Sequence, residues 1–105
     1  MATSIDQKTV DELKQAHGPE LRMIAGCVYR KPKRGEWDRY TDKILSDKSQ
    51  ISRAARELAA SCVVWPSQEA MNAVLDNRPA LLLNEILTAL SEMAGAEDEE
   101  EVKKL

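Results

Sequence analysis

The side chains that most often carry out chemistry are scarce in this sequence. Its 105 residues include one histidine, His17, and two cysteines, Cys27 and Cys62. His17 has no second His or Cys at the spacing of a metal site, and a nucleophilic cysteine would need that histidine and an oxyanion hole beside it. Acidic pairs such as Glu57 and Glu69 fall on helix faces that we expect to be solvated. The sequence therefore predicts no enzyme, no metal and no cofactor.

The two cysteines lie among apolar neighbours, where a thiol behaves as a small hydrophobic group. No secretory leader precedes them, so we expect free thiols in a cytosolic protein rather than a disulfide. The apolar runs are only a few residues long, against the roughly 20 that a membrane-spanning helix needs. We expect no membrane segment.

A contact surface is the chemistry that the sequence does offer, in the basic and aromatic segment 28–40. Arg, Trp and Tyr are the residue types enriched at protein-binding hot spots, and aromatic rings can also stack on nucleic-acid bases. A third reading is a solvated face whose long side chains cover apolar neighbours. The residues concerned are Arg30, Lys31, Lys33, Arg34, Trp37, Arg39, Tyr40 and Lys43.

The overall charge argues against a nucleic-acid partner. The chain has a net charge of −3, and residues 97–101 are all acidic, whereas nucleic-acid-binding domains are usually basic. Trp37 and Tyr40 also fall on the expected apolar face of a helix, which favours packing over stacking. We expect residues 96–105 to be a disordered, solubilising acidic tail.

Pro32 separates two kinds of predicted structure because it lacks an amide donor and holds the residue before it extended. In residues 1–32 we expect a helix opened by a Ser4–Gln7 capping box and ended by Gly18. Residues 21–29 then alternate as in a strand, with Gly26 marking a bulge or a tight hairpin. The backbone of this strand must pair within a short hairpin, with a second copy of the chain, or with a partner.

For residues 33–95 we expect a small helical domain, so the predicted fold class is mainly α. Apolar residues recur at helical spacing in four segments, which are 37–45, 51–63, 70–75 and 82–93. Ser49 and Ser67 are the expected N-caps, Pro79 the first residue of the last helix, and Gly95 its end. The run Leu81-Leu82-Leu83 widens the apolar arc of the last helix. Either this helix is buried on most sides, or one flank is left for a partner.

The order of these features resembles the small tail assembly chaperones of long-tailed bacteriophages, over roughly residues 10–95. The family pattern favours a Ser or Thr cap after the Arg-x-Pro motif, where this chain has Lys33, although Glu36 can still complement the helix N-terminus. The residues that carry the resemblance are Leu13-Lys14, His17-Gly18, Tyr29-Arg30-Lys31-Pro32, Glu36-Trp37, Arg39-Tyr40, Ala60-Ser61-Cys62-Val63-Val64-Trp65-Pro66, Pro79-Ala80-Leu81 and Met93-Ala94-Gly95.

The resemblance implies a non-enzymatic protein that binds the tape measure protein in the host bacterial cytoplasm while the tail tube assembles, and that is absent from the mature virion. The tail tube protein is a further candidate partner, and the strand at residues 21–29 a candidate site of homo-oligomerisation. We expect Arg30, Lys33, Arg34 and Arg39 to face solvent. The expected partner-binding residues are Arg30, Lys33, Arg34, Trp37, Arg39, Tyr40, Trp65, Leu81 and Leu82.

Two other functions are consistent with the sequence. One is a small nucleic-acid-binding regulator that uses the basic segment. The other is a structural tail or head-completion protein, which would differ from a chaperone in being present in the virion.

Overall fold

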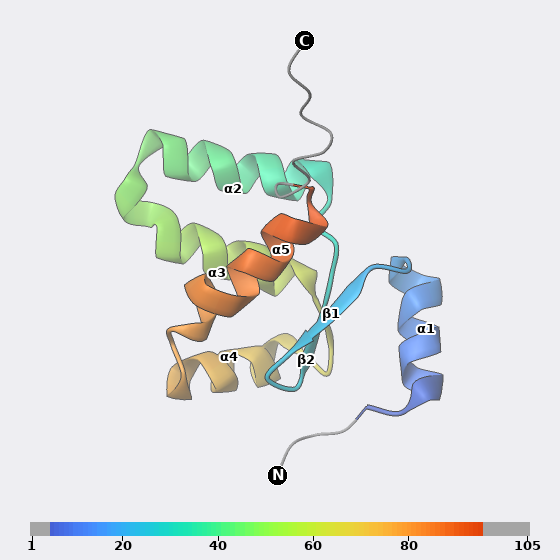
Figure 1. The fold of residues 1–105 in the computed structure, drawn as a ribbon. Helices are drawn as coiled ribbons and strands as arrows, with labels where there is room; N and C mark the ends of the chain where they lie inside the picture. The colour runs from blue at the N-terminus through green and yellow to red at the C-terminus, as the bar shows by residue number, and fades with distance from the viewer. Residues whose placement is uncertain (1–4, 96–105) are drawn as a thin grey trace.

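A three-stranded antiparallel sheet lies among five α-helices in the computed structural model, which describes residues 5–95 (Figure 1). The predicted fold class is confirmed, with four helices after Pro32 and a helix and a hairpin before it. The elements are α1 (Gln7–His17), β1 (Leu21–Ile24), β2 (Cys27–Arg30), α2 (Arg34–Ser46), a 3₁₀ turn η1 (Lys48–Gln50), α3 (Ile51–Cys62), β3 (Val63–Trp65), α4 (Gln68–Asn77), a π-helical stretch η2 (Leu82–Ile86) and α5 (Leu87–Met93).

Strands β1 and β2 form a tight hairpin. Ala25 and Gly26 link them, with φ of 51° and 83°, and positive φ at both central residues is what a two-residue hairpin turn requires. Leu21 lies opposite Arg30 and Ile24 opposite Cys27. Of the two readings of Gly26, the hairpin is the one that the structure adopts.

The third strand, β3, was not predicted. The helical spacing predicted a helix that continues to Val63, but α3 ends at Cys62 and residues 63–65 are extended. β-Branched residues favour a strand, and the residue before Pro66 avoids the helical region. Tyr29 lies opposite Val63, so the hairpin pairs with a later segment of its own chain. In the part of the chain that the structure describes, β1 and β3 are the edge strands.

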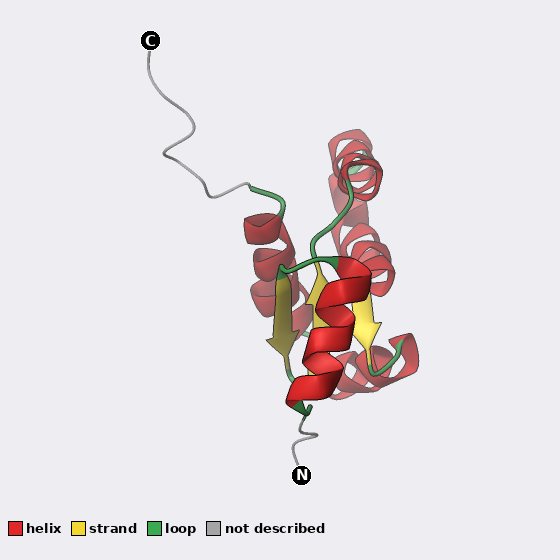
Figure 2. Cartoon of the chain, turned by 90° about the vertical axis from the view of Figure 1, so that its right-hand side faces the viewer, coloured by secondary structure: helices red, strands yellow, loops and turns green. Residues whose placement is uncertain are grey.

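The main core lies on one face of the sheet. Figures 1 and 2 show α1 on one side of the strands, with α3, α4 and α5 on the other. Helix α1 buries none of its residues, although Val10 and Leu13 are half-buried. The core cluster consists of Cys27, Tyr29, Tyr40, Ala54, Ala55, Leu58, Ala59, Cys62, Met71, Leu75, Leu82, Ile86, Leu90 and Met93. The cluster contains Cys27 and Tyr29 from before Pro32 together with residues from after it. The division of the chain into a segment 1–32 and a helical domain 33–95 stays a prediction.

Of the two alternatives for the last helix, an open flank is the one that the structure adopts, since Leu83 is 38% exposed while Leu82, Ile86, Ala89, Leu90 and Met93 are buried. Leu83 lies in a π-helical stretch, in which hydrogen bonds span five residues and the amide of Leu87 donates to the carbonyl of Leu82. A turn at residues 79–80 precedes the helix, so Pro79 is not its first residue.

The helix caps follow the sequence only in part. Asp6, rather than Ser4, caps α1 by accepting from the amide of Thr9 at 2.8 Å, and Ser4 lies outside the described residues. The prediction of Ser49 as the N-cap of α3 is wrong, because Gln50 occupies that position. The amide of Ser49 instead donates a hydrogen bond to the Asp47 carboxylate, which caps the 3₁₀ turn. Ser67 is confirmed, since its hydroxyl accepts from the amide of Ala70 at 3.1 Å.

The predicted acidic tail, residues 96–105, also lies outside the described residues. None of the helices within residues 5–95 is long and apolar enough to cross a membrane.

We expect Ser67→Ala to lower the free energy of unfolding by about 1 kcal/mol, because the cap of α4 loses its acceptor. Urea denaturation followed by circular dichroism measures this. Ser52→Ala is the matched control, since Ser52 is exposed inside α3 and Ala is the better helix former there. An equal loss in both variants would contradict the capping role.

Candidate functional site

The two cysteines and the histidine do not form a reactive centre in the described structure. Within residues 5–95 no group of three or more His, Cys, Asp and Glu side chains is placed to hold a metal ion. Both cysteines are buried, whereas His17 is exposed. Burial raises the pKa of the Cys27 thiol and raises that of Cys62 to about 12. Because the thiolate is the reactive form, both thiols are inert in the folded protein.

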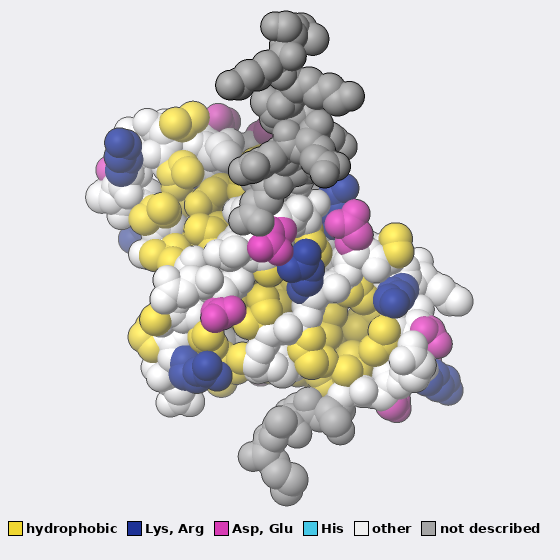
Figure 3. Space-filling model, viewed as in Figure 1, with side chains coloured by type: hydrophobic (Ala, Val, Ile, Leu, Met, Phe, Trp, Pro, Cys, Tyr) yellow, Lys and Arg dark blue, Asp and Glu magenta, His cyan; other side chains and the backbone are white. Residues whose placement is uncertain are grey.

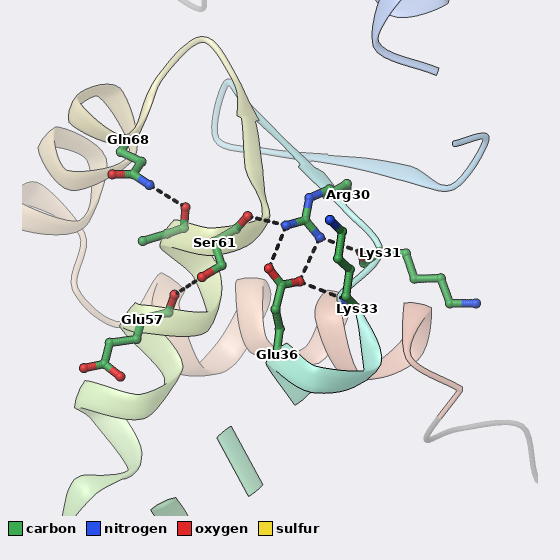
Figure 4. A network of polar contacts seen from close by, with 8 residues as sticks. Arg30, Lys31, Lys33, Glu36, Glu57, Ser61 and Gln68 are labelled. Atoms are coloured by element: carbon green, nitrogen blue, oxygen red, sulfur yellow. Dashed lines mark hydrogen bonds and ion pairs between the residues drawn. The ribbon is translucent and has the colours of Figure 1, made fainter. Parts of the chain in front are cut away.

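Arg30 is the centre of a polar network that joins three elements (Figure 4). Its Nη1 and Nη2 atoms donate to both carboxylate oxygens of Glu36, at 2.9 and 2.8 Å. Nη2 also donates to the carbonyl of Ser61 at 2.7 Å, and Nη1 to the carbonyl of Lys31 at 3.1 Å. The side chains of Arg30 and Glu36 are only 12% and 20% exposed. This clamp joins the end of β2, the first turn of α2 and the last turn of α3.

Glu36 also fixes the start of α2. Its Oε1 atom accepts from the amide of Lys33 at 2.8 Å, which is one half of a capping box. Lys33 is the N-cap residue, and its ammonium group has no acceptor for the other half. The hydrogen bonds from Arg30, and to a smaller extent the one from Lys33, lower the pKa of Glu36. The expected role of Glu36 at this helix N-terminus is confirmed.

The predicted partner-binding residues fall into different environments. Arg30 was expected in solvent, but it is held by Glu36 because the guanidinium fork matches a carboxylate. Tyr40 and Leu82 are core residues, and Leu82 also lines a groove on the surface. Trp37 and Leu81 are half-buried against the core, and Trp37 lies 5.2 Å from Tyr40 between ring centroids. Trp65 is half-buried in β3, and the three side chains that remain exposed are Lys33, Arg34 and Arg39.

Three of the four large apolar side chains that are exposed within residues 5–95 lie away from the hairpin. Leu45 is 80% exposed in the last turn of α2, and Ile51, the first residue of α3, is 38% exposed. Leu83 joins them, since it lines one groove with Ser52 and Arg53, the residues that follow Ile51. We call Leu45, Ile51 and Leu83 the distal apolar patch. Figure 1 shows that the α2–α3 connection and the start of the last helix lie on the same side of the molecule, and Figure 3 shows apolar side chains gathered there.

A groove of about 550 Å³ adjoins the distal apolar patch, between α3, α4 and the last helix. Its floor includes Leu75, Pro79 and Leu82, and its rim carries an ion pair between Arg56 and Asp76 at 3.6 Å. An apolar floor with a charged rim is the chemistry that accepts an apolar side chain from a partner. In the sequence, the signals for this surface were the run 81–83 and the position of Leu45 at the end of an apolar stripe.

We expect the native protein to leave both thiols unmodified by a disulfide reagent such as DTNB at pH 8, and to react at both once unfolded in guanidinium chloride. Absorbance of the released thiolate counts the reacted cysteines. Rapid reaction of either thiol in the native state would contradict its burial and raised pKa.

Replacing Glu36 by Gln should lower the free energy of unfolding by about 1–3 kcal/mol at pH 7, since charged hydrogen bonds to Arg30 are lost. The folded-state pKa of Glu36 lies below its usual 4.5, so its stabilisation is complete above that pH and is lost as the pH falls through the lowered folded-state pKa. The stability difference between the wild type and Glu36→Gln should therefore shrink as the pH falls below 4.5 and through the lowered pKa of Glu36.

Urea titrations at pH 7, 5, 4 and 3 make this comparison. Asp38→Asn is the matched control, because Asp38 meets only the exposed Arg34, at 3.7 Å, and exposed pairs contribute about 0–1 kcal/mol. A stability difference between wild type and Glu36→Gln that persists unchanged to pH 3 would show that the carboxylate is not what stabilises the clamp.

Comparisons with known proteins find one family and one solved structure that are similar to this chain, and neither name states a function. No curated protein matches the chain. The solved structure of an uncharacterised protein, rbstp2171, from Bacillus stearothermophilus is similar, with 27% sequence identity and a TM-score of 0.68. The similarity covers 91% of this chain and 98% of that one. The model of a domain of unknown function, DUF6848, matches residues 11–103, so the chain belongs to the DUF6848 family.

Proposed function

We propose that this protein is a non-enzymatic tail assembly chaperone of a long-tailed bacteriophage. It binds the tape measure protein in the host cytoplasm, keeps it soluble while the tail tube assembles, and is left out of the mature virion. The observation that carries the proposal is the distal apolar patch beside the groove at Leu82 and Pro79. The order of sequence motifs that resembles this chaperone family supports it independently.

The physical argument begins with the exposure of Leu45. Single exposed apolar residues are ordinary, but several large ones gathered at one place mark an interaction site. Burying a leucine or isoleucine side chain contributes roughly 1.5–3 kcal/mol. Three such side chains give a modest gross energy, and the ordering of two partners opposes it. The result is a weak, reversible contact, which suits a chaperone that must release its client.

The shape of the patch favours a helical client. Leu45, Ile51 and Leu83 come from α2, α3 and η2, and Leu83 lines an open groove. An amphipathic helix can place apolar residues at i, i+3, i+4 and i+7 across such a surface. A tape measure protein with long coiled-coil-forming segments presents this pattern many times over. Each chaperone molecule would then cover one short stretch of a long client.

The edge of β1 is the proposed place for self-association or for the tail tube protein. Within residues 5–95 no strand pairs with the outer side of β1, and Met23 on it is 46% exposed. An unpaired edge presents backbone donors and acceptors to another strand.

We expect the double variant Leu45→Asp, Leu83→Asp to lose at least half of the client solubility that the wild type provides when each is co-expressed with the tape measure protein. Charges at these positions cannot be buried against an apolar helix without a large desolvation cost. The soluble fraction of the tape measure protein, measured after centrifugation, is the readout.

Asn72→Asp is the control, because Asn72 is exposed on α4, outside the distal apolar patch, and the variant introduces the same kind of charge. It should leave client solubility unchanged. If the wild type itself does not raise the soluble fraction, the proposed function is wrong. If purified virions contain the protein by mass spectrometry, a structural tail or head-completion role replaces the chaperone role.

A further inference from the structure

A basic groove of about 700 Å³ lies at the end of α2 opposite to the distal apolar patch. The C-terminal end of α1, the loop before α2 and the start of β3 form its walls. Its charged lining is entirely basic, with no Asp or Glu side chain, while two valines supply an apolar wall. The residues that define it are His17, Arg30, Lys31, Lys33, Val63 and Val64.

The lysines are the positive charges of this groove that remain available. Arg30 is already neutralised by Glu36. Lys31 has only a loose partner, Glu20 at 3.8 Å, and both side chains are 54% exposed. Lys33 makes no ion pair with any residue in the range 5–95. Figure 4 shows Lys33 extending beside the Arg30 guanidinium and Lys31 pointing away from it.

An acidic segment of the same chain starts close by. Residues 97–101 are Glu-Asp-Glu-Glu-Glu, and the first of them comes two positions after Gly95. Figures 1 and 2 both show the end of α5 and the loop before α2 at the same end of the molecule. Six extended residues span up to about 20 Å, so the carboxylates of residues 97–101 are on a short tether that starts at this same end of the molecule.

We propose that the acidic segment 97–101 binds in the basic groove of its own chain and pairs with Lys31 and Lys33. Solvated ion pairs contribute at most about 1 kcal/mol each. The covalent connection compensates for this, since a short linker holds the segment at an effective concentration in the millimolar range. The contact is screened by salt. This site does not depend on the chaperone function, and it gives the basic segment of an acidic protein a ligand within its own chain.

Zero-length cross-linking with a carbodiimide tests the proposal on the full chain. The reagent joins a lysine amine to a carboxylate that touches it, and proteolysis with mass spectrometry then locates the link. We expect links from Lys31 and Lys33 to residues 97–101 at low salt, and at least a fivefold smaller yield in 0.5 M NaCl. Lys33→Gln should remove the Lys33 link and leave the one from Lys31.

Two internal controls keep the experiment interpretable. Lys43 and Glu57 form an ion pair on α2 and α3, and their link shows that the reagent works. Lys48 is an exposed lysine just beyond the other end of α2, and it should give no link to the acidic segment. A variant with residues 97–101 replaced by their amides should lose the links to Lys31 and Lys33 and keep the Lys43–Glu57 link.

Three outcomes would overturn the proposal. The first is a Lys43–Glu57 link without any link to residues 97–101. The second is equal linking of the segment to Lys48 and Lys33, which would indicate unspecific contact. The third is linking between copies, detected by mixing ¹⁴N- and ¹⁵N-labelled protein at equal amounts and finding mixed-isotope peptides. None of these measurements involves the tape measure protein, so failure here leaves the proposed function untouched.

Discussion

The ion pair between Arg30 and Glu36 is the interaction on which the arrangement of the chain depends. Arg30 ends β2, the central strand of the sheet, and Glu36 lies in the first turn of α2. The same guanidinium holds the carbonyl of Ser61 in the last turn of α3, at the point where the chain turns from a helix into β3. One side chain therefore sets where α2 begins and how α3 passes into the sheet. Because the pair is largely buried, loss of either partner would leave a charge without compensation.

The elements that could be predicted are those set by nearby residues. The apolar face of α3 repeats at helical spacing, and the structure buries those positions. The cap at Ser67 and the hairpin at Gly26 likewise follow from local backbone requirements. Strand β3 could not be predicted in this way, since Val63 pairs with Tyr29, more than thirty positions earlier. A three-residue strand has almost no periodicity of its own, and its partner decides its conformation.

The predicted site shows the same division between local and long-range causes. The helical phase correctly placed Trp37 and Tyr40 toward the core. It could not show that Arg30 is held by Glu36 and Ser61, because that contact requires α3 to lie beside the hairpin. Leu83 lies in a π-helical stretch, for which the sequence carried no signal beyond a run of three leucines. Exposure is a property of the packed molecule, so the partner-binding set was the least predictable part.

Helix α2 connects the basic groove with the distal apolar patch. Lys33 precedes its first residue and Leu45 lies in its last turn, so about 20 Å of helix separates the basic groove from the distal apolar patch. The two surfaces differ in their physical basis. Apolar contact is insensitive to salt and weakens on cooling, whereas pairing with carboxylates is screened within a Debye length. A client helix bound at the patch and an acidic segment held in the groove therefore need not compete, because neither surface offers what the other ligand requires. The Arg30 guanidinium is bound to Glu36, so it adds no free charge to the basic groove.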